Sequence, residues 1–123
     1  MGKNLIIGNA TGYNWQHLKY WVRSIKDIGF DGDVVIVGSD MNGDVVQKLS
    51  QEGVILHLFG APTEDGGVET KGHGVPHVER FFYIWTFLQE NVNKYDRVVV
   101  TDTRDVIFQR DPFRWLEDKL RLH

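Results

Sequence analysis

The hydrophobic positions of the chain follow two alternating patterns. Short apolar runs occupy residues 5–8, 33–38, 54–59 and 98–100, and the second of these is rich in β-branched side chains, which is typical of a buried strand. Between the runs, apolar residues recur every three or four positions over residues 15–28, 45–49 and 78–88, as they do in amphipathic helices. This order predicts an α/β fold with a mostly parallel sheet and helices on both of its faces.

Local signals place the ends of several elements. Gly8 is expected to stop the first strand, and Asn14 is a suitable N-cap for the helix that follows. Gly29 is expected to end that helix, because glycine adopts the left-handed conformation of a C-terminal cap without strain. Asp111 and Pro112 predict the start of a short last helix as its N-cap and first residue.

The middle of the chain contains a predicted loop and a strongly apolar helix. Residues 60–76 show no periodicity and are rich in glycine, proline and charge, so a long surface loop is predicted there. The helical spacing of the residues that follow predicts an apolar stripe that belongs to the core and is not a platform for a ligand. This stripe consists of Val78, Phe81, Phe82, Trp85 and Leu88.

Composition restricts the function classes. The 123 residues have the size of one ordinary domain, which we expect to span residues 1–123. A net charge of -3 with interspersed signs gives no basic surface for nucleic acid, so nucleic acid is not an expected partner. The absence of cysteine excludes disulfides and thiolate-bound zinc. No run approaches the roughly 18 apolar residues of a membrane span, and the first apolar run is too short for a signal peptide, so a cytoplasmic location is expected.

The most informative feature is a pair of acids at the end of the fourth apolar run. Asp102 and Asp105 follow three valines, with Arg104 between them, and ligands of open α/β sheets bind at the carboxyl ends of strands. Two carboxylates can hold Mn²⁺ or Mg²⁺, which in turn can hold a diphosphate. Both acids are equally typical of a turn after a strand. Arg104 fits either a phosphate contact or an ion pair with its neighbours.

The residues after the first strand fit a nucleoside. Asn9 and Thr11 carry hydrogen-bonding groups, and Tyr13 has a ring that can stack on a base. Gly8 and Gly12 also permit an interpretation as a dinucleotide-binding loop, but the G-x-G-x-x-G spacing is absent and Tyr13 would crowd a phosphate there. An ordinary capped turn between a strand and a helix would explain the same residues.

Two further polar residues are candidates for the same site. Asp40 follows the second predicted strand, where it fits a contact to a ribose hydroxyl or a base, or a cap of the next helix. Arg80 lies one turn into the third predicted helix, where it fits a contact to donor phosphates or exposure to water. Both are included in the predicted nucleotide-sugar site.

These residues together resemble a known family. Residues 98–113, with the helix over residues 79–88 before them, resemble GT-A glycosyltransferases, in particular the viral and bacterial group related to the chlorella virus capsid-glycosylating enzyme. Gly12 and Tyr13, the helix over residues 18–25 and the strand over residues 34–37 are similar to the nucleotide-binding half of that family. The resemblance covers nearly the whole chain. It implies a Rossmann-like sheet and a UDP- or GDP-sugar donor, with the base near the first two strand ends.

The chain departs from the pattern of the family at two points. The usual motif is Asp-x-Asp, whereas two residues separate Asp102 from Asp105. The resemblance favours Asp105 as the direct ligand of the cation and places Asp102 on the ribose or on a water of the cation. Members of the family normally continue with a half that binds the acceptor, so the resemblance implies that this chain is the donor-binding half alone.

Three hypotheses follow from the sequence. The first is the donor half of a glycosyltransferase, which binds a nucleotide-diphospho-sugar through a divalent metal and transfers the sugar to an acceptor. The second is a Rossmann-like NAD(P)-binding protein that uses the loop over residues 8–12. The third is a non-catalytic interaction module. The sequence assigns no catalytic base, no glycan or protein acceptor and no oligomeric state.

Overall fold

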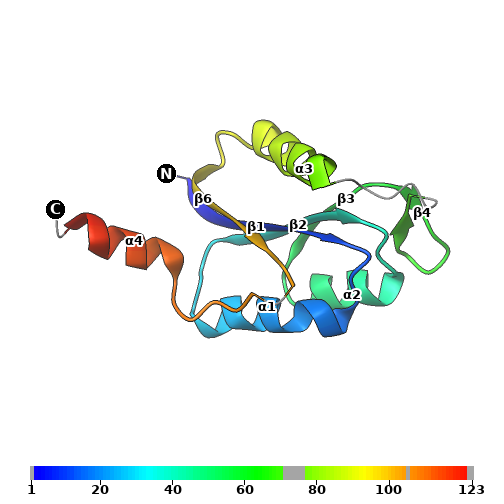
Figure 1. The fold of residues 1–123 in the computed structure, drawn as a ribbon, viewed down its shortest axis with the longest axis horizontal. Coiled ribbons are helices and arrows are strands. Elements are labelled where there is room, and N and C mark those ends of the chain that lie inside the picture. The colour runs from blue at the N-terminus through cyan, green and yellow to red at the C-terminus, as the bar shows by residue number, and fades with distance from the viewer. Residues whose placement is uncertain (1, 71–76, 105, 122–123) are drawn as a thin grey trace.

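The computed structural model describes residues 2–70, 77–104 and 106–121 of the chain (Figure 1). The elements in order are β1 (Lys3–Thr11), α1 (Trp15–Asp27), β2 (Asp33–Ser39), α2 (Gly43–Gln51), β3 (Ile55–Leu58), β4 (Ala61–Pro62), β5 (Val68–Glu69), α3 (His77–Glu90), β6 (Tyr95–Asp102) and α4 (Pro112–Arg121). Within the described ranges, no helix combines the length and the apolar character needed to cross a bilayer.

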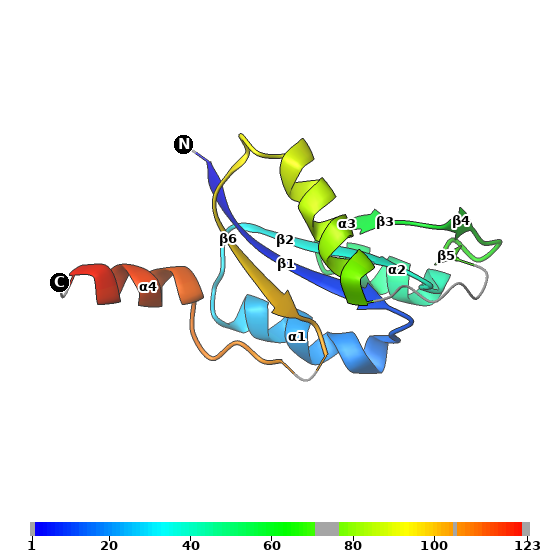
Figure 2. The same cartoon turned by 45° about the horizontal axis from the view of Figure 1, so that its top comes forward.

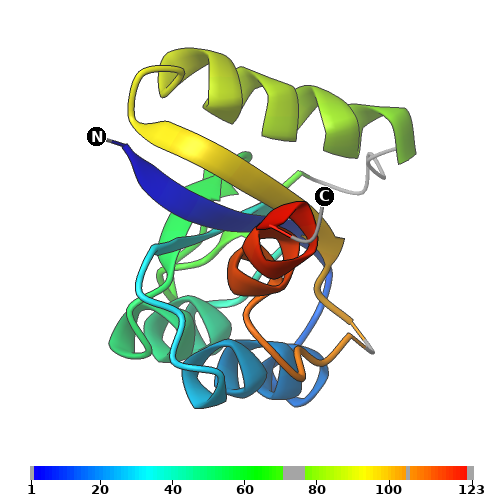
Figure 3. The ribbon, with the colours of Figure 1, turned by 90° about the vertical axis from the view of Figure 1, so that its left-hand side faces the viewer.

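The main sheet has four parallel strands in the order β3-β2-β1-β6. Helices α1 and α2 lie against one face of this sheet and α3 against the other, which is clearest when the molecule is seen from its side (Figure 3). The α/β architecture, the parallel sheet and the helices on both faces are therefore confirmed. The order of the strands reverses between β1 and β6, because the chain winds outward from β1 to β3 and then returns through α3 to the other side of β1. Ligands of open α/β sheets bind at such a reversal.

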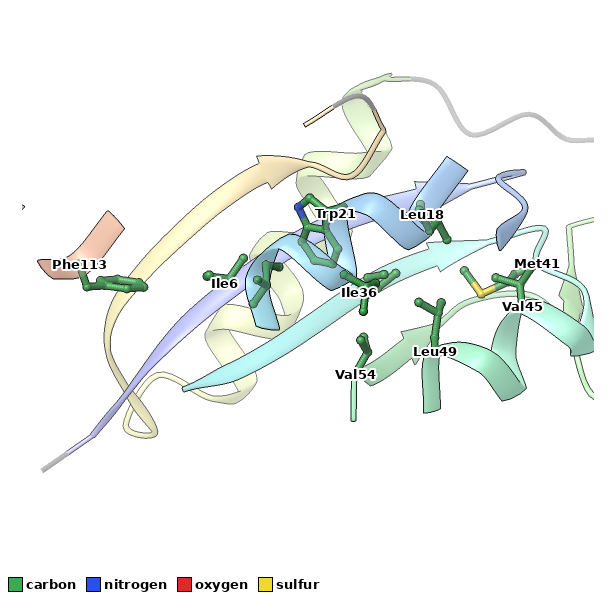
Figure 4. Close-up of a cluster of buried hydrophobic side chains, with 12 residues drawn as sticks. Ile6, Leu18, Trp21, Ile36, Met41, Val45, Leu49, Val54 and Phe113 are labelled. Atoms are coloured by element: carbon green, nitrogen blue, oxygen red, sulfur yellow. The ribbon is translucent and has the colours of Figure 1, made fainter. Parts of the chain in front are cut away.

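Two core clusters lie on the two faces of the sheet, because successive side chains of a strand point to opposite faces. The cluster under α1 and α2 includes Ile6, Leu18, Trp21, Ile36, Met41, Val45, Leu49, Val54 and Phe113 (Figure 4). The cluster under α3 comprises Leu5, Ile7, Val35, Val37, Ile84 and Phe87, with Phe59, Tyr83, Leu88 and Tyr95 packed against it. β1 contributes to both clusters and is the central element of the fold.

Gly8 does not stop the first strand, and this prediction is wrong. β1 continues through Gly8 to Thr11, and the last residues of the strand pair with β2 and β6. A Cβ atom at Gly8 would lie well inside van der Waals contact of the Thr103 methyl group. Glycine is thus present because another segment of the chain approaches the strand closely at this point, and not because the strand ends there.

The buried face of α3 also differs from the prediction. Ile84 and Phe87 are only 8% and 6% exposed, whereas Phe81, Phe82 and Trp85 are 69%, 59% and 57% exposed. Apolar residues occupy more than one side of this helix, so periodicity alone does not identify the face that packs. α3 crosses the sheet over β1 and β2 (Figure 2), and this placement turns three members of the expected core stripe outward.

The predicted helix ends are confirmed. The Asn14 side chain accepts a hydrogen bond from the His17 backbone N–H, and the His17 ring accepts one from the Asn14 N–H, which closes a capping box at the start of α1. Gly29 follows the last turn with a φ of 73°, a conformation that favours glycine. At α4, the Asp111 carboxylate accepts a hydrogen bond of 2.9 Å from the Phe113 N–H.

The predicted loop over residues 60–76 contains a small hairpin. β4 and β5 pair in antiparallel fashion, and Met41, just after β2, pairs with Val68 of β5. The loop prediction therefore misses the strands at residues 61–62 and 68–69, because strands of two residues are too short to produce a periodic pattern. Residues 71–76 lie outside the part of the chain that the structure describes.

The orientation of α3 predicts different costs for two neighbouring substitutions. Ile84→Ala removes a buried side chain and should lower the free energy of unfolding by about 2–4 kcal/mol. Trp85→Ala removes a larger but mostly exposed side chain and should cost less than about 1 kcal/mol. Urea unfolding of both variants measures the two values. A larger loss for Trp85→Ala would show that the helix packs through the other face.

Candidate functional site

The carboxyl ends of β1 and β6 place two predicted site residues opposite each other. In the register of these strands Ile7 pairs with Val100 and Asn9 pairs with Asp102, so the side chains of Asn9 and Asp102 point to the same face of the sheet, the face that α3 covers. Asn9 is only 7% exposed, whereas the Asp102 carboxylate is exposed to solvent. The edge therefore presents a buried amide beside an accessible carboxylate.

Only one of the two polar groups of the Asn9 side-chain amide has a hydrogen-bond partner. Its oxygen accepts a hydrogen bond of 3.3 Å from the Thr11 hydroxyl, while its Nδ2 group has no partner within the described part of the chain. Most buried polar groups in proteins are hydrogen-bonded, and an unsatisfied one costs about 1–3 kcal/mol. Trp21 Nε1, in the core, is likewise without a partner among the described residues, so the unpaired donor of Asn9 indicates a ligand position only together with the hollow beside it.

A hollow adjoins this amide between α3 and the ends of β1 and β6. Its volume is about 250 Å³, and we call it the α3 pocket. It is lined by Asn9, Phe81, Ile84, Val100, Thr101 and Asp102. Its walls are largely apolar, and its polar groups come from the ends of the strands, a combination that is typical of sites for small molecules.

Phe81 is a site residue that the sequence did not predict, since the helical stripe assigned it to the core. The structure places it on the wall of the α3 pocket, with most of its surface exposed. The signal that was present in the sequence is the excess of aromatic residues in α3, which is more than one face of a helix can bury.

Thr103 is a second residue that the sequence did not predict. It is almost completely buried, and its hydroxyl donates a hydrogen bond of 2.8 Å to the backbone carbonyl of Asn9. Its methyl group occupies the space that the missing side chain of Gly8 leaves free. Thr103 therefore fastens the segment after β6 to the end of β1, directly next to the acid motif.

The loop between β1 and α1 brings further predicted residues to the same edge. The Gly12 N–H donates hydrogen bonds to the carbonyls of Ser39 and Asp40, which ties this loop to the end of β2. Gly12 has a φ of 72°, so its backbone conformation explains the glycine. The guanidinium of Arg104 lies 5.8 Å from the ring centre of Tyr13, within the range of a cation–π interaction.

Asp40 is engaged in holding the β4–β5 hairpin. Its carboxylate accepts hydrogen bonds from the Thr70 backbone N–H at 2.9 Å, from the Thr70 hydroxyl at 2.8 and 3.0 Å, and from the Ser39 hydroxyl at 3.2 Å. Burial alone would raise the pKa of Asp40, but the hydrogen bonds from Thr70 and Ser39 together outweigh it and lower the pKa. The structure thus gives this carboxylate a role in the fold.

The structure brings most of the predicted site residues to one edge of the sheet. These are Asn9, Thr11, Gly12, Tyr13, Asp102 and Arg104, with Asp40 beside them at the end of β2. Asp105 lies outside the described residues, and of Arg80 only the backbone, near the start of α3, is described.

The described residues contribute one member of the predicted metal pair. In residues 2–70, 77–104 and 106–121, no three side chains of histidine, aspartate or glutamate are grouped so that they could hold a metal ion. Asp102 supplies an exposed carboxylate, the hard oxygen ligand that Mg²⁺ and Mn²⁺ prefer. Mg²⁺ is commonly held by one or two carboxylates, substrate phosphates and water, so this edge fits a cation that arrives with a diphosphate.

A larger hollow lies elsewhere, between residues 40–42, which precede α2, and the β4–β5 hairpin, with a volume of about 630 Å³. Two of the four acids that line it are bound within the fold: the Asp65 carboxylate accepts hydrogen bonds from the backbone N–H groups of Gly43 and Gly67, and the Asp40 carboxylate accepts one from the Thr70 N–H. These contacts join the hairpin to the end of β2 and the start of α2. The candidate site is therefore the edge formed by β1 and β6.

No match to this chain is found among protein-family profiles, curated proteins or solved structures. The functional interpretation accordingly depends on the residues and the geometry of this chain.

The half-satisfied amide predicts a stabilising substitution. Asn9→Leu removes the unpaired donor and adds apolar surface beside Ile84 and Val100, so it should raise the free energy of unfolding of the ligand-free protein by about 1 kcal/mol. Chemical denaturation measures this difference. Thr11→Val is the comparison variant: it removes the half-buried partner of the amide oxygen and keeps the unpaired donor, so it should not raise the free energy of unfolding. A loss of stability in Asn9→Leu would contradict this account of the amide.

The hydrogen bonds of Asp40 predict a dependence of stability on pH. Its pKa is lowered in the folded state, so its contribution is present above the ordinary pKa of 3.8 and is lost as the pH falls through the lowered value. Asp40→Asn should lower stability at neutral pH by about 1–2 kcal/mol and flatten the decline below about pH 4. Asparagine tolerates the φ of 50° at this position, so the variant isolates the carboxylate. Chemical denaturation at several pH values measures the free energy of unfolding. An Asp40→Asn variant whose stability falls below about pH 4 as steeply as that of the wild-type chain would contradict this account.

Proposed function

We propose that this chain binds a nucleotide-diphospho-sugar together with Mn²⁺ or Mg²⁺ at the edge formed by β1 and β6, as the donor-binding half of a GT-A glycosyltransferase with a Rossmann-like sheet. The observation that carries the proposal is the juxtaposition of Asn9 and Asp102 at the point where the order of the strands reverses. This is the position at which open α/β sheets bind their ligands.

Each part of the proposed ligand has a complementary group at this edge. The resemblance to GT-A enzymes assigns the cation to Asp105 directly and to Asp102 through a water or the adjacent ribose, and of these two acids the structure describes Asp102. Arg104, beside Tyr13, offers a guanidinium that fits phosphate oxygens in a bidentate contact. The ring of Tyr13 offers a face for the base. When bound, the cation supplies positive charge that stabilises the departing nucleoside diphosphate.

The NAD(P)-binding alternative receives less support from the geometry. A dinucleotide needs free N–H groups at the start of the first helix to bind its pyrophosphate. In this chain the Asn14 side chain accepts from the His17 N–H, so part of that donor set is already used within the helix. The spacing of Gly8 and Gly12 also lacks the third glycine of the motif.

The third hypothesis, an interaction module, is favoured by one observation. Phe82 and Trp85 are large, exposed and outside the lining of the α3 pocket, and exposed apolar groups that lie together often mark contact surfaces. A contact of this kind is compatible with nucleotide-sugar binding, because the two surfaces use different residues of α3.

The proposal predicts metal-dependent binding of nucleoside diphosphates. UDP or GDP with Mn²⁺ should stabilise the protein in thermal denaturation, by about 2.7 kcal/mol at a hundredfold excess over the dissociation constant, and reduced dinucleotide should not. Asp102→Ala should weaken binding by about tenfold or more in titration calorimetry, since it removes a charged contact.

The matched control for this experiment is Asp96→Ala. Asp96 is an exposed acid on the same strand as Asp102, but it lies at the amino end of β6, at the irregularity in the pairing with β1 and away from the proposed site. Its substitution should leave binding unchanged. Equal effects of the two substitutions, or stabilisation by UDP and GDP that needs no metal, would contradict the proposal.

A further inference from the structure

We propose that the α3 pocket holds the sugar ring of the nucleotide-sugar and that Asn9 is the residue that positions it. This inference rests on the proposed function and adds which part of the ligand enters the pocket. Three observations support it: the unpaired Nδ2 group of Asn9, the apolar walls of the pocket, and the place of Asp102 in both the pocket and the acid motif.

Two hydrogen bonds fix the position of Asn9 and the orientation of its side-chain amide. The Thr11 hydroxyl donates to its oxygen, which turns Nδ2 away from Thr11, and Thr103 fixes the backbone at the same residue. The orientation of the donor is thus set before a ligand arrives. Nδ2 is itself buried in the ligand-free chain, so a ligand oxygen that reaches it displaces neighbouring atoms slightly and in return removes the cost of a buried unpaired N–H group.

The chemistry of the pocket fits a sugar. Phe81, Ile84 and Val100 offer apolar walls to the C–H faces of a pyranose ring. A hydroxyl group is at once a donor and an acceptor. Two neighbouring hydroxyls can therefore accept from the Asn9 amide and donate to the Asp102 carboxylate at the same time, which satisfies both protein groups with one ring.

The position of the pocket favours the sugar over the base. Asp102 belongs both to the pocket and to the acid motif, so a group in the pocket lies next to the proposed position of the diphosphate. The sugar is bonded directly to the diphosphate, whereas the ribose separates the base from it. Tyr13, the ring proposed for the base, packs against the core cluster on the opposite face of the sheet. A ligand that crosses the edge of the sheet thus reaches Tyr13 with its base and the α3 pocket with its sugar.

The test compares ligands with and without the sugar. UDP and UDP-glucose, and in parallel GDP and GDP-mannose, are titrated with Mn²⁺ into the wild-type chain and into the Asn9→Leu and Phe81→Ala variants. The expected result is a loss of about tenfold or more in affinity for the nucleotide-sugar in both variants, with affinity for the nucleoside diphosphate unchanged within about twofold. Phe82→Ala is the matched control, because Phe82 is the neighbouring exposed phenylalanine of α3 and does not line the pocket.

Other outcomes overturn the inference and separate it from the proposed function. Equal losses for UDP and UDP-glucose, or no loss for either, would mean that the sugar does not occupy the pocket. If the wild-type chain binds no nucleoside diphosphate, the proposed function fails. Titration of glucose 1-phosphate and mannose 1-phosphate then decides the pocket alone: saturable binding that Asn9→Leu abolishes upholds it, and absence of binding overturns it.

Discussion

The parallel pairing of β1 with β6 is the constraint on which the site depends. It sets Asn9 opposite Asp102, although more than ninety residues separate them along the chain. The hydrogen bond from Thr103 to the Asn9 carbonyl secures this pairing at its end, and the missing side chain of Gly8 provides the space for Thr103. A buried amide, an accessible acid and the opening of a pocket consequently meet at one edge of the sheet.

The site also contains one of the two buried side-chain groups that have no hydrogen-bond partner in the described residues, the other being Trp21 Nε1. Nearly every other buried polar side chain that the structure describes has a partner, as the bonds of Ser24, Ser39 and Thr103 illustrate, whereas the Asn9 amide retains an unpaired N–H group. The side chain of Phe81 stands in solvent beside it. Local departures from the rules of folding concentrate at functional sites, because a ligand supplies the contacts that the fold omits. The unpaired amide of Asn9 and the exposed ring of Phe81 line the same pocket, and we therefore interpret them together.

The features that the sequence predicted are those set by local physics. The strands, the capping of α1 by Asn14, the end of that helix at Gly29 and the α/β architecture depend on neighbouring residues or on simple periodicity. The strand-end rule likewise placed Asn9 and Asp102 at one edge. The buried face of α3, the function of Gly8 and the bonds of Asp40 to Thr70 were not predictable in this way, because each depends on a segment distant in sequence.

The most direct test of the account is a crystal structure of the chain with a UDP- or GDP-sugar and Mn²⁺, with anomalous scattering used to locate the metal. The account predicts a manganese peak at the acid motif beside Asp102, the diphosphate bound to that ion, and the Asn9 amide donating to a ligand oxygen in the α3 pocket. An ordered nucleotide-sugar bound elsewhere, or manganese absent from the carboxyl ends of β1 and β6, would contradict it.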